Sequence, residues 1–488
     1  MNGPVAKAEL VSLRTKLFYG LGSVAFGIKD NGFQTILLLF YNQVIGLPGP
    51  LVGLAIAIAL MVDAFLDPIV GQISDNFHSR WGRRHPFMYA SALPVAVSYL
   101  LLWNPPHWSQ HALFFYLLGV AIVVRTFITF YEIPSSALAP ELTEDYDQRT
   151  SFISFRLFFG WYGGLTMLIL AYTVFLQPDA THKVGQLNET GYSHYGIVAS
   201  IIMFAAIIIS SMGTHRFISH LRVPPARRVS MVQYIREMFA SLSNKAFLIL
   251  MLAGVLFQVS TGLVFALGIY VNTYFWQLTT TQISLITLST FIAVFLAFLI
   301  ALPLSKRFGK KHASMVMFVV GIIVATMPLA LRLVNFFPVN GSPLLVPLLF
   351  AFSVFGAGLA IGSSILLVSM LADVVEDSEL KTGRRSEGLF FAGSSFMQKS
   401  ASGLGLLGSG LILSAAHFPA HAVPGHVDPQ IIRNFALIYL PVTVVLYLVA
   451  MAIIGLYPIT RETHEENLRK LASEVAQAGE PVDMGVTD

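Results

Sequence analysis

The sequence has no cysteine and few charged residues. Without Cys the chain has no disulfide framework, no thiol nucleophile, no Cys-x-x-Cys redox pair and no thiolate ligand for zinc. Only 11% of the 488 residues are charged, whereas ordinary soluble proteins have about 25%. A soluble, disordered or coiled-coil chain is therefore excluded, and the 55% apolar content indicates a protein embedded in lipid.

Apolar runs recur along the whole chain. Each is long enough to cross a hydrocarbon core of about 30 Å. Backbone groups in lipid must be hydrogen-bonded within the protein, and the runs show no alternation of polar and apolar residues, so they are predicted to be helices. We count twelve runs, at 17–45, 51–74, 87–104, 110–140, 152–177, 194–213, 246–275, 281–304, 313–333, 343–375, 388–416 and 432–457.

Basic residues predict the orientation. With both termini in the cytoplasm, 23 of the 30 Lys and Arg residues fall on inner segments, and only Lys183, Arg332 and Arg433 fall on outer loops. The high isoelectric point therefore reflects membrane topology, and no nucleic-acid partner is expected. A cleaved signal peptide is not expected either, because the first apolar run is too long for one.

The chain contains an internal repeat. Arg80-Trp81-Gly82-Arg83-Arg84-His85, between the second and third runs, returns as Arg307-Phe308-Gly309-Lys310-Lys311-His312 between the eighth and ninth. Parallel repeats of this kind build the major facilitator fold. We predict an all-α membrane protein with twelve transmembrane helices in two pseudo-symmetric six-helix halves. The expected parts are an N-terminal half at 1–213, a cytoplasmic linker at 214–245, a C-terminal half at 246–457 and a cytoplasmic tail at 458–488.

Charged residues stand inside the apolar runs. An ionisable group at that depth costs roughly 2.5–3.5 kcal/mol on insertion scales and by default indicates function. The acids and bases nearly balance, as a shared polar cavity requires. Arg125 is also inside a run, but nothing in the sequence assigns it a role. The others are Lys29, Asp30, Asp63, Asp67, Glu132, Arg156 and Lys399.

Two of these acids, Asp63 and Asp67, lie four residues apart and share one helical face. Crowded carboxylates in a low-dielectric cavity favour a bound cation, either H⁺ or Na⁺. Such a cation couples transport to conformation if it binds one conformation more tightly than the other. A purely structural pairing with Lys399 is the simpler alternative, but it does not explain an excess of acids around one base.

Several motifs carry a family resemblance. They are Phe26-Gly27-Ile28-Lys29-Asp30, Asp63-x-x-x-Asp67-Pro68, Arg80-Trp81-Gly82-Arg83-Arg84 and Lys381-Thr382-Gly383-Arg384-Arg385. Together they resemble the glycoside–pentoside–hexuronide:cation symporters. The resemblance implies sugar uptake coupled to H⁺ or Na⁺ by alternating access, without a cofactor or a metal other than Na⁺. It implies a cation site at Asp63, Asp67, Asp30 and Thr129, and substrate contacts from Asp30, Glu132, Arg156 and Lys399.

The chain departs from this family at two positions. Leu66 stands where the group has an asparagine, which removes an oxygen ligand and favours a proton. Ser136 stands where the group has a tryptophan that stacks on the sugar. The solute site expected here therefore includes Ser136, with an aromatic platform that is either missing or supplied by Trp161, Tyr162, Tyr270 or Tyr274.

The inner loops are expected to form a gate. The loop after the second helix resembles the superfamily loop in which Asp and Arg side chains latch one conformation. The alternative is that these loops are only solvated, and that their basic residues reflect the preference of Lys and Arg for cytoplasmic loops. The expected gating residues are Asp75, Arg80, Gly82, Arg83, Arg84, Arg384 and Arg385.

Two other functions remain open. The first is transport of a lysophospholipid or another amphipathic anion, with Arg156 or Lys399 pairing its charge; Asp30 and Glu132 instead favour a polyhydroxylated solute. The second is a membrane enzyme, but Gly403-x-Gly405-x-x-Gly408 lies in an apolar helix and is interpreted as helix packing. We therefore expect a monomeric symporter, not an enzyme, in a bilayer, the bacterial inner membrane.

Overall fold

The structure is a computed structural model of the chain. It describes residues 12–143, 145–180, 182–218, 244–382 and 387–459, and beyond these only 462, 463, 466 and 469. The described residues form helices joined by short loops and contain no strand. The N-terminal helices are α2 (Leu13–Leu21), α3 (Ser23–Asn31), η1 (Gly32–Ile36), α4 (Leu37–Leu39), η2 (Phe40–Val44), α5 (Gly49–Asn76), α6 (His85–Leu102), α7 (Gln110–Ser136), α8 (Ala139–Leu142), α9 (Tyr146–Leu170), η3 (Ala171–Phe175), η4 (Gly185–Leu187) and α10 (Glu189–His215). The C-terminal helices are α12 (Lys245–Tyr270), η6 (Val271–Phe275), α13 (Thr280–Leu333), α14 (Leu345–Thr382), α15 (Glu387–Ala415) and α16 (Pro429–Gly455).

These helices make twelve membrane passes, as the apolar runs predicted. Nine of the described helices are long and apolar enough to cross a membrane by themselves. One of them, α13, contains two passes joined at Gly309, where a φ of 76° interrupts the helix. The first pass is divided into α2, α3, η1, α4 and η2, and α15 forms the eleventh pass.

Polar side chains cap the helices where the loops meet the apolar runs. Asn188 and Asn244 each accept a hydrogen bond from the backbone N–H three residues on, over 3.1 Å. Thr279 and Gln282 form a reciprocal capping box at the start of α13. Four π-helical turns (η1, η2, η3 and η6) lie within or at the end of passes, where they change the direction of the following side chains.

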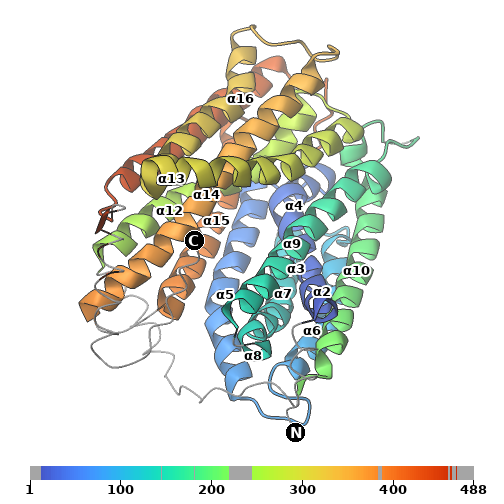
Figure 1. The fold of residues 1–488 in the computed structure, drawn as a ribbon. Helices are drawn as coiled ribbons and strands as arrows, with labels where there is room; N and C mark the ends of the chain where they lie inside the picture. The colour runs from blue at the N-terminus through green and yellow to red at the C-terminus, as the bar shows by residue number, and fades with distance from the viewer. Residues whose placement is uncertain are drawn as a thin grey trace, which may run out of the picture.

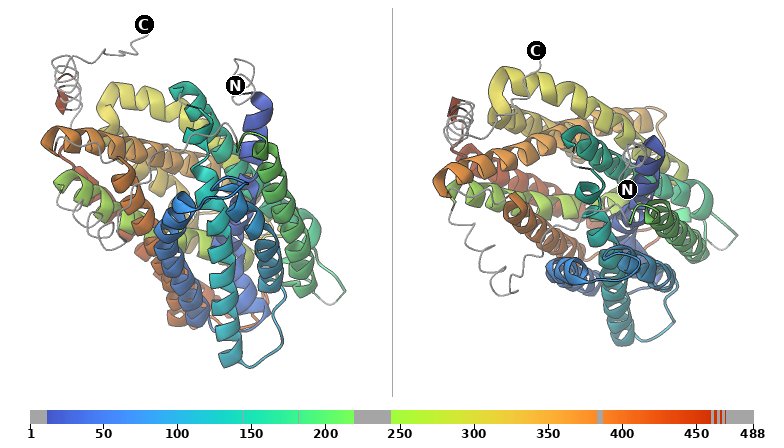
Figure 2. Two further views of the ribbon diagram at one scale, coloured as in Figure 1. Left: turned by 90° about the horizontal axis from the view of Figure 1, so that it is seen from below. Right: turned by 60° about the horizontal axis from the view of Figure 1, so that its bottom comes forward.

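The passes form two groups of six. In Figure 1 the helices from α2 to α10, blue to green, lie beside those from α12 to α16, and seen from below the two groups again lie side by side (Figure 2). The sequence repeat has the same backbone in both halves, because Gly82 and Gly309 have φ values of 73° and 76°. Glycine adopts this conformation at little cost. The next residue forms an ion pair of 2.6 Å in each half, Arg83 with Glu141 and Lys310 with Asp373.

The two ends of the bundle differ in how the halves meet. We call the end that carries Leu13, the loop 77–84 and the start of α12 the linker side, and the opposite end the far side. Toward the far side α15 packs directly on α5, with Gly410 against the backbone of Gly49. Deeper in the bundle Gly403 approaches Ala57. Small residues allow this approach, which confirms that the glycines of α15 serve helix packing.

Candidate functional site

A cluster of charged side chains joins the two halves near the middle of the membrane. Asp63 and Asp67 come from α5, Thr129 from α7 and Lys399 from α15. The Lys399 ammonium lies 2.5 Å from Asp67 Oδ2 and 3.2 Å from Asp63 Oδ2. The Thr129 hydroxyl donates to Asp63 Oδ1 over 2.7 Å and lies 3.5 Å from Asp67 Oδ1. The structure therefore brings together three of the four expected cation-site residues with the expected lysine.

The two carboxylates differ in their environment. The Asp63 side chain is 1% exposed, whereas that of Asp67 is 17% exposed. Asp63 also has a neighbour that sequence reasoning left without a role, because Arg125 Nη1 lies 3.6 Å from its Oδ2. The sequence does not show which acid a single base inside an apolar run will contact. Asp63 thus lies between two cationic groups.

A second charged cluster lies next to the first. Lys29 on α3 is buried and lies 2.8 Å from Asp30 Oδ1 and 3.8 Å from Glu132 Oε2. The Asp30 and Glu132 side chains are 41% and 25% exposed. The fourth expected cation-site residue, Asp30, therefore contacts Lys29. Lys29 interacts electrostatically with Asp63, and Glu132 with Lys399, so the two clusters form one network.

Arg156 on α9 is held in place beside this network. Its Nη1 donates to Ser135 Oγ over 2.9 Å and its Nη2 to the Glu132 carbonyl over 3.2 Å. Its guanidinium lies 4.8 Å from the centroid of the Phe26 ring. Ser136 is exposed, and its hydroxyl donates to the Ile133 carbonyl over 2.8 Å. The structure thus places Glu132 and Arg156 near each other. Ser136 directly follows Ser135 in the chain.

Tyr270 and Tyr274 are buried in a seal at the far side. The Tyr270 hydroxyl donates to Asn42 Oδ1 over 2.8 Å. The Tyr274 hydroxyl donates to Gln43 Oε1 over 3.3 Å and to the Ala422 carbonyl over 3.0 Å. Both lie at the end of the seventh pass, beyond the depth of the acids, so they contact the first pass here and not an open cavity. A contact of these tyrosines with solute is not formed in this closed arrangement and stays a prediction.

Gln43 is the centre of this seal and is 2% exposed. Its Nε2 donates to the Pro419 carbonyl over 3.1 Å, and its Oε1 accepts from the Ala422 N–H over 2.8 Å. Gln186 makes a further bond between the halves, donating to the Leu278 carbonyl over 2.8 Å. The far side is therefore closed. Because carboxylates are not expected to face lipid, the partial exposure of Asp30 and Glu132 favours access to the charged network from the linker side.

The expected gating residues form ion pairs at the linker side. Arg84 lies 2.5 Å from Asp75 Oδ1 and 3.1 Å from Glu141 Oε1. Arg83 pairs with the same Glu141 oxygen, and Arg80 lies over the ring of Trp81. These contacts connect segments of the N-terminal half, so a latch between the halves stays a prediction. Arg384 and Arg385 lie outside the described residues.

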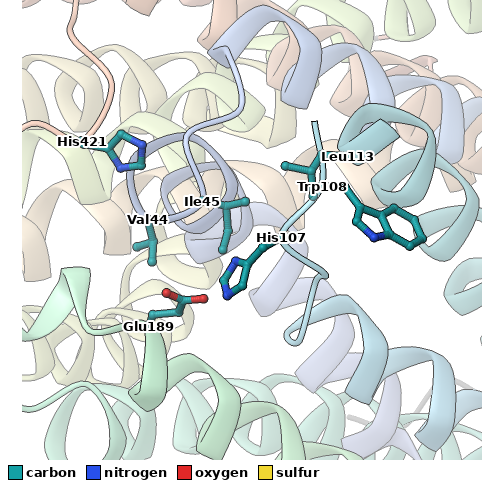
Figure 3. A pocket seen from close by; sticks show the side chains of 7 residues that line it. All are labelled: Val44, Ile45, His107, Trp108, Leu113, Glu189 and His421. Carbon is teal, nitrogen blue, oxygen red and sulfur yellow. The ribbon is translucent and has the colours of Figure 1, made fainter. Parts of the chain in front are cut away.

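A pocket of about 350 Å³ lies at the far side, away from the acidic cluster. Glu189 and His107 face one another there, and His421 lies at its edge (Figure 3). His421 Nδ1 is 3.1 Å from the Gln43 carbonyl, so the pocket borders the seal. Within the described ranges no group of three His, Asp or Glu side chains is placed to hold a metal ion.

Twelve passes in two similar halves, with buried charges between them, define a secondary transporter of the major facilitator type. Residues 18–461 match the model of the family described as MFS/sugar transport protein, and the chain belongs to this family. It is therefore a membrane transporter of the sugar-symporter type and not an enzyme.

Known relatives agree with this assignment. The chain is 27% identical to an uncharacterised symporter of Synechocystis sp., covering 95% of this chain and 97% of the relative. It is 25% identical to the isoprimeverose transporter of Lactiplantibacillus pentosus, covering 86% and 83%. Its fold is similar to that of the xylose transporter XylE from E. coli in an inward-open conformation, with a TM-score of 0.62, 15% identity and coverage of 93% and 98%.

Proposed function

We propose that the protein imports a sugar-like, polyhydroxylated solute together with a cation, H⁺ or Na⁺, by alternating access. The contact of Lys399 with both Asp63 and Asp67 is the observation that carries this proposal. The lysine comes from one half and the two acids from the other, at distances of 3.2 and 2.5 Å. A change of charge at the acids therefore acts directly on the contact between the halves.

The coupling follows from the charge balance at this contact. While both acids are ionised, they attract Lys399 and stabilise the approach of α15 to α5. A cation bound at one acid weakens that attraction in a low-dielectric site, where charges interact strongly. The cation and the solute then favour one conformation together, provided that each of them binds that conformation more tightly than it binds the other.

The solute site we propose is the surface of Asp30, Glu132 and Arg156 that is reached from the linker side. Ionised carboxylates accept strong hydrogen bonds from paired hydroxyl groups, and a guanidinium donates to ring and hydroxyl oxygens. The fixed position of Arg156 over Phe26 reduces the entropy lost on binding. A lysophospholipid is disfavoured because its phosphate would meet the partly exposed Asp30 and Glu132 carboxylates.

The orientation and location are also proposals. Basic residues concentrate on the linker side, as in Arg83, Arg84, Lys310 and Lys311, which indicates the cytoplasm. The described conformation is then closed to the outside. We propose that the protein acts as a monomer in the bacterial inner membrane, with both termini in the cytoplasm.

Reconstituted full-length protein tests this function. Liposomes containing it are screened for uptake of glycosides, uronates and lysophospholipids, with imposed gradients of H⁺ or Na⁺. We expect at least one glycoside or uronate to accumulate only when an inward cation gradient is present. Arg156→Ala and Glu132→Gln should abolish its binding, and Gln110→Ala is the control, because Gln110 bonds within the N-terminal half at the far side. Accumulation of lysophospholipids alone would refute the sugar assignment.

A further inference from the structure

Arg125 is a buried base that the proposed transport cycle does not yet use. Its side chain is 5% exposed, with Nη1 3.6 Å from Asp63 Oδ2. Its guanidinium also lies 5.0 Å from the centroid of the Phe33 ring. A buried guanidinium is costly unless an opposite charge compensates it, and Asp63 supplies that charge. Arg125 therefore places a fixed positive charge at the carboxylate pair.

The contacts of Asp63 leave little room for another cation. Its Oδ1 accepts from Thr129 over 2.7 Å, and its Oδ2 faces both Lys399 and Arg125. At the pair itself, the negative charges of Asp63 and Asp67 thus face the positive charges of Lys399 and Arg125, while Lys29 is matched by Asp30 and Glu132. A Na⁺ ion would add a third positive charge where repulsion is only weakly screened.

Of the two carboxylates, Asp67 exchanges protons with the solution more easily. Its side chain is 17% exposed against 1% for Asp63. A proton neutralises this acid without needing a cage of oxygen ligands. The charged groups that act on Asp67 are Lys399 on α15, Asp63 on its own helix and Glu132 on α7. Arg125 on α7 faces Asp63, and Lys29 on α3 pairs with Asp30 and lies near Glu132.

We propose that Arg125 acts as a built-in counter-ion for Asp63, which excludes Na⁺ from the carboxylate pair and leaves a proton on Asp67 as the coupling ion. The inference rests on the proposed symport and names its ion. The proton enters from the solution that the open side faces and binds an Asp67 oxygen. Lys399 then keeps Asp63 as its charged partner. After the halves have moved, the proton leaves to the other solution.

Binding of radioactive ²²Na⁺ to the purified full-length protein tests this assignment without any solute. Wild type should show no saturable Na⁺ binding. Arg125→Ala should gain it, with saturable ²²Na⁺ binding at least about tenfold above the wild-type background, because a unit positive charge about 4 Å away is removed. The double variant Arg125→Ala with Asp63→Asn should lose it again. Arg125→Lys is the matched control, since it keeps the charge and should exclude Na⁺ as wild type does.

Two results would overturn the proposal. One is saturable Na⁺ binding by wild type. The other is a folded Arg125→Ala protein, monodisperse on size exclusion, that binds no Na⁺. If the alanine variant does not fold, Arg125→Met removes the charge while keeping a side chain of similar volume. Its Na⁺ binding is then compared with that of wild type in the same way. Neither result bears on whether a sugar is carried, because a Na⁺-coupled sugar symporter would fail here and still pass the uptake screen.

Discussion

Removal of the Gln43 side chain should open the far side of the transporter. Three hydrogen bonds connect this amide to the C-terminal half, at Pro419, Tyr274 and Ala422. Each contributes about 1 kcal/mol net. Gln43→Ala should therefore destabilise the closed far side by about 3 kcal/mol, which shifts the ratio of open to closed molecules by roughly 100-fold.

The absence of native cysteine provides the assay for this shift. Ala266, one turn deeper than Tyr270 on α12, is fully buried. An Ala266→Cys reporter is then labelled from outside intact cells by a membrane-impermeant maleimide. We expect up to about 100-fold faster labelling in the Gln43→Ala background. Gln110→Ala, a change of the same residue type at the far side, should leave the rate unchanged. Equal labelling rates with and without Gln43 would refute the role of this amide in closure.

Three further substitutions test other parts of the structure. Glu141→Gln leaves the buried Arg83 without its acid, while Arg84 keeps Asp75, and should cost about 3–5 kcal/mol; an unchanged thermal unfolding midpoint would contradict this. Arg156→Lys loses the paired bonds to Ser135 and Glu132 and should weaken solute binding about tenfold by calorimetry; unaltered affinity would place the solute elsewhere. Gly410→Val pushes α15 away from the backbone of Gly49 and should stop uptake. Gly254→Ala, which meets open space, is its control.

The sequence predicted the fold well because hydropathy and basic loops act on whole segments. The repeat around Gly82 and Gly309 was informative for a different reason. A positive φ at both positions limits the choice of residue, so the glycine recurs in each half. The π-helical turns were not predictable, because a single inserted residue leaves the apolar content of a pass unchanged. The pairing of Asp67 with Lys399 was among the alternatives that the sequence left open, because a buried charge needs an opposite charge.

Other parts of the site depend on how the passes rotate against each other. The sequence showed that Arg125 is inside the membrane, but not that it faces Asp63, because helical periodicity does not determine which neighbour a face meets. Asn42 and Gln43 carry no charge, so nothing distinguished them from ordinary polar residues. The burial of Tyr270 and Tyr274 depends on the conformation, and a single sequence is compatible with both the open and the closed far side.

Uphill accumulation by the Asp67→Asn variant is the most direct test of coupling through the two carboxylates. Liposomes containing the variant receive an inward cation gradient and a glycoside that wild type concentrates. We expect the variant to equilibrate the glycoside, or exchange it across the membrane, without concentrating it, because Asn cannot gain or lose a proton. Accumulation to the wild-type level would contradict a coupling role for Asp67 and its contact with Lys399.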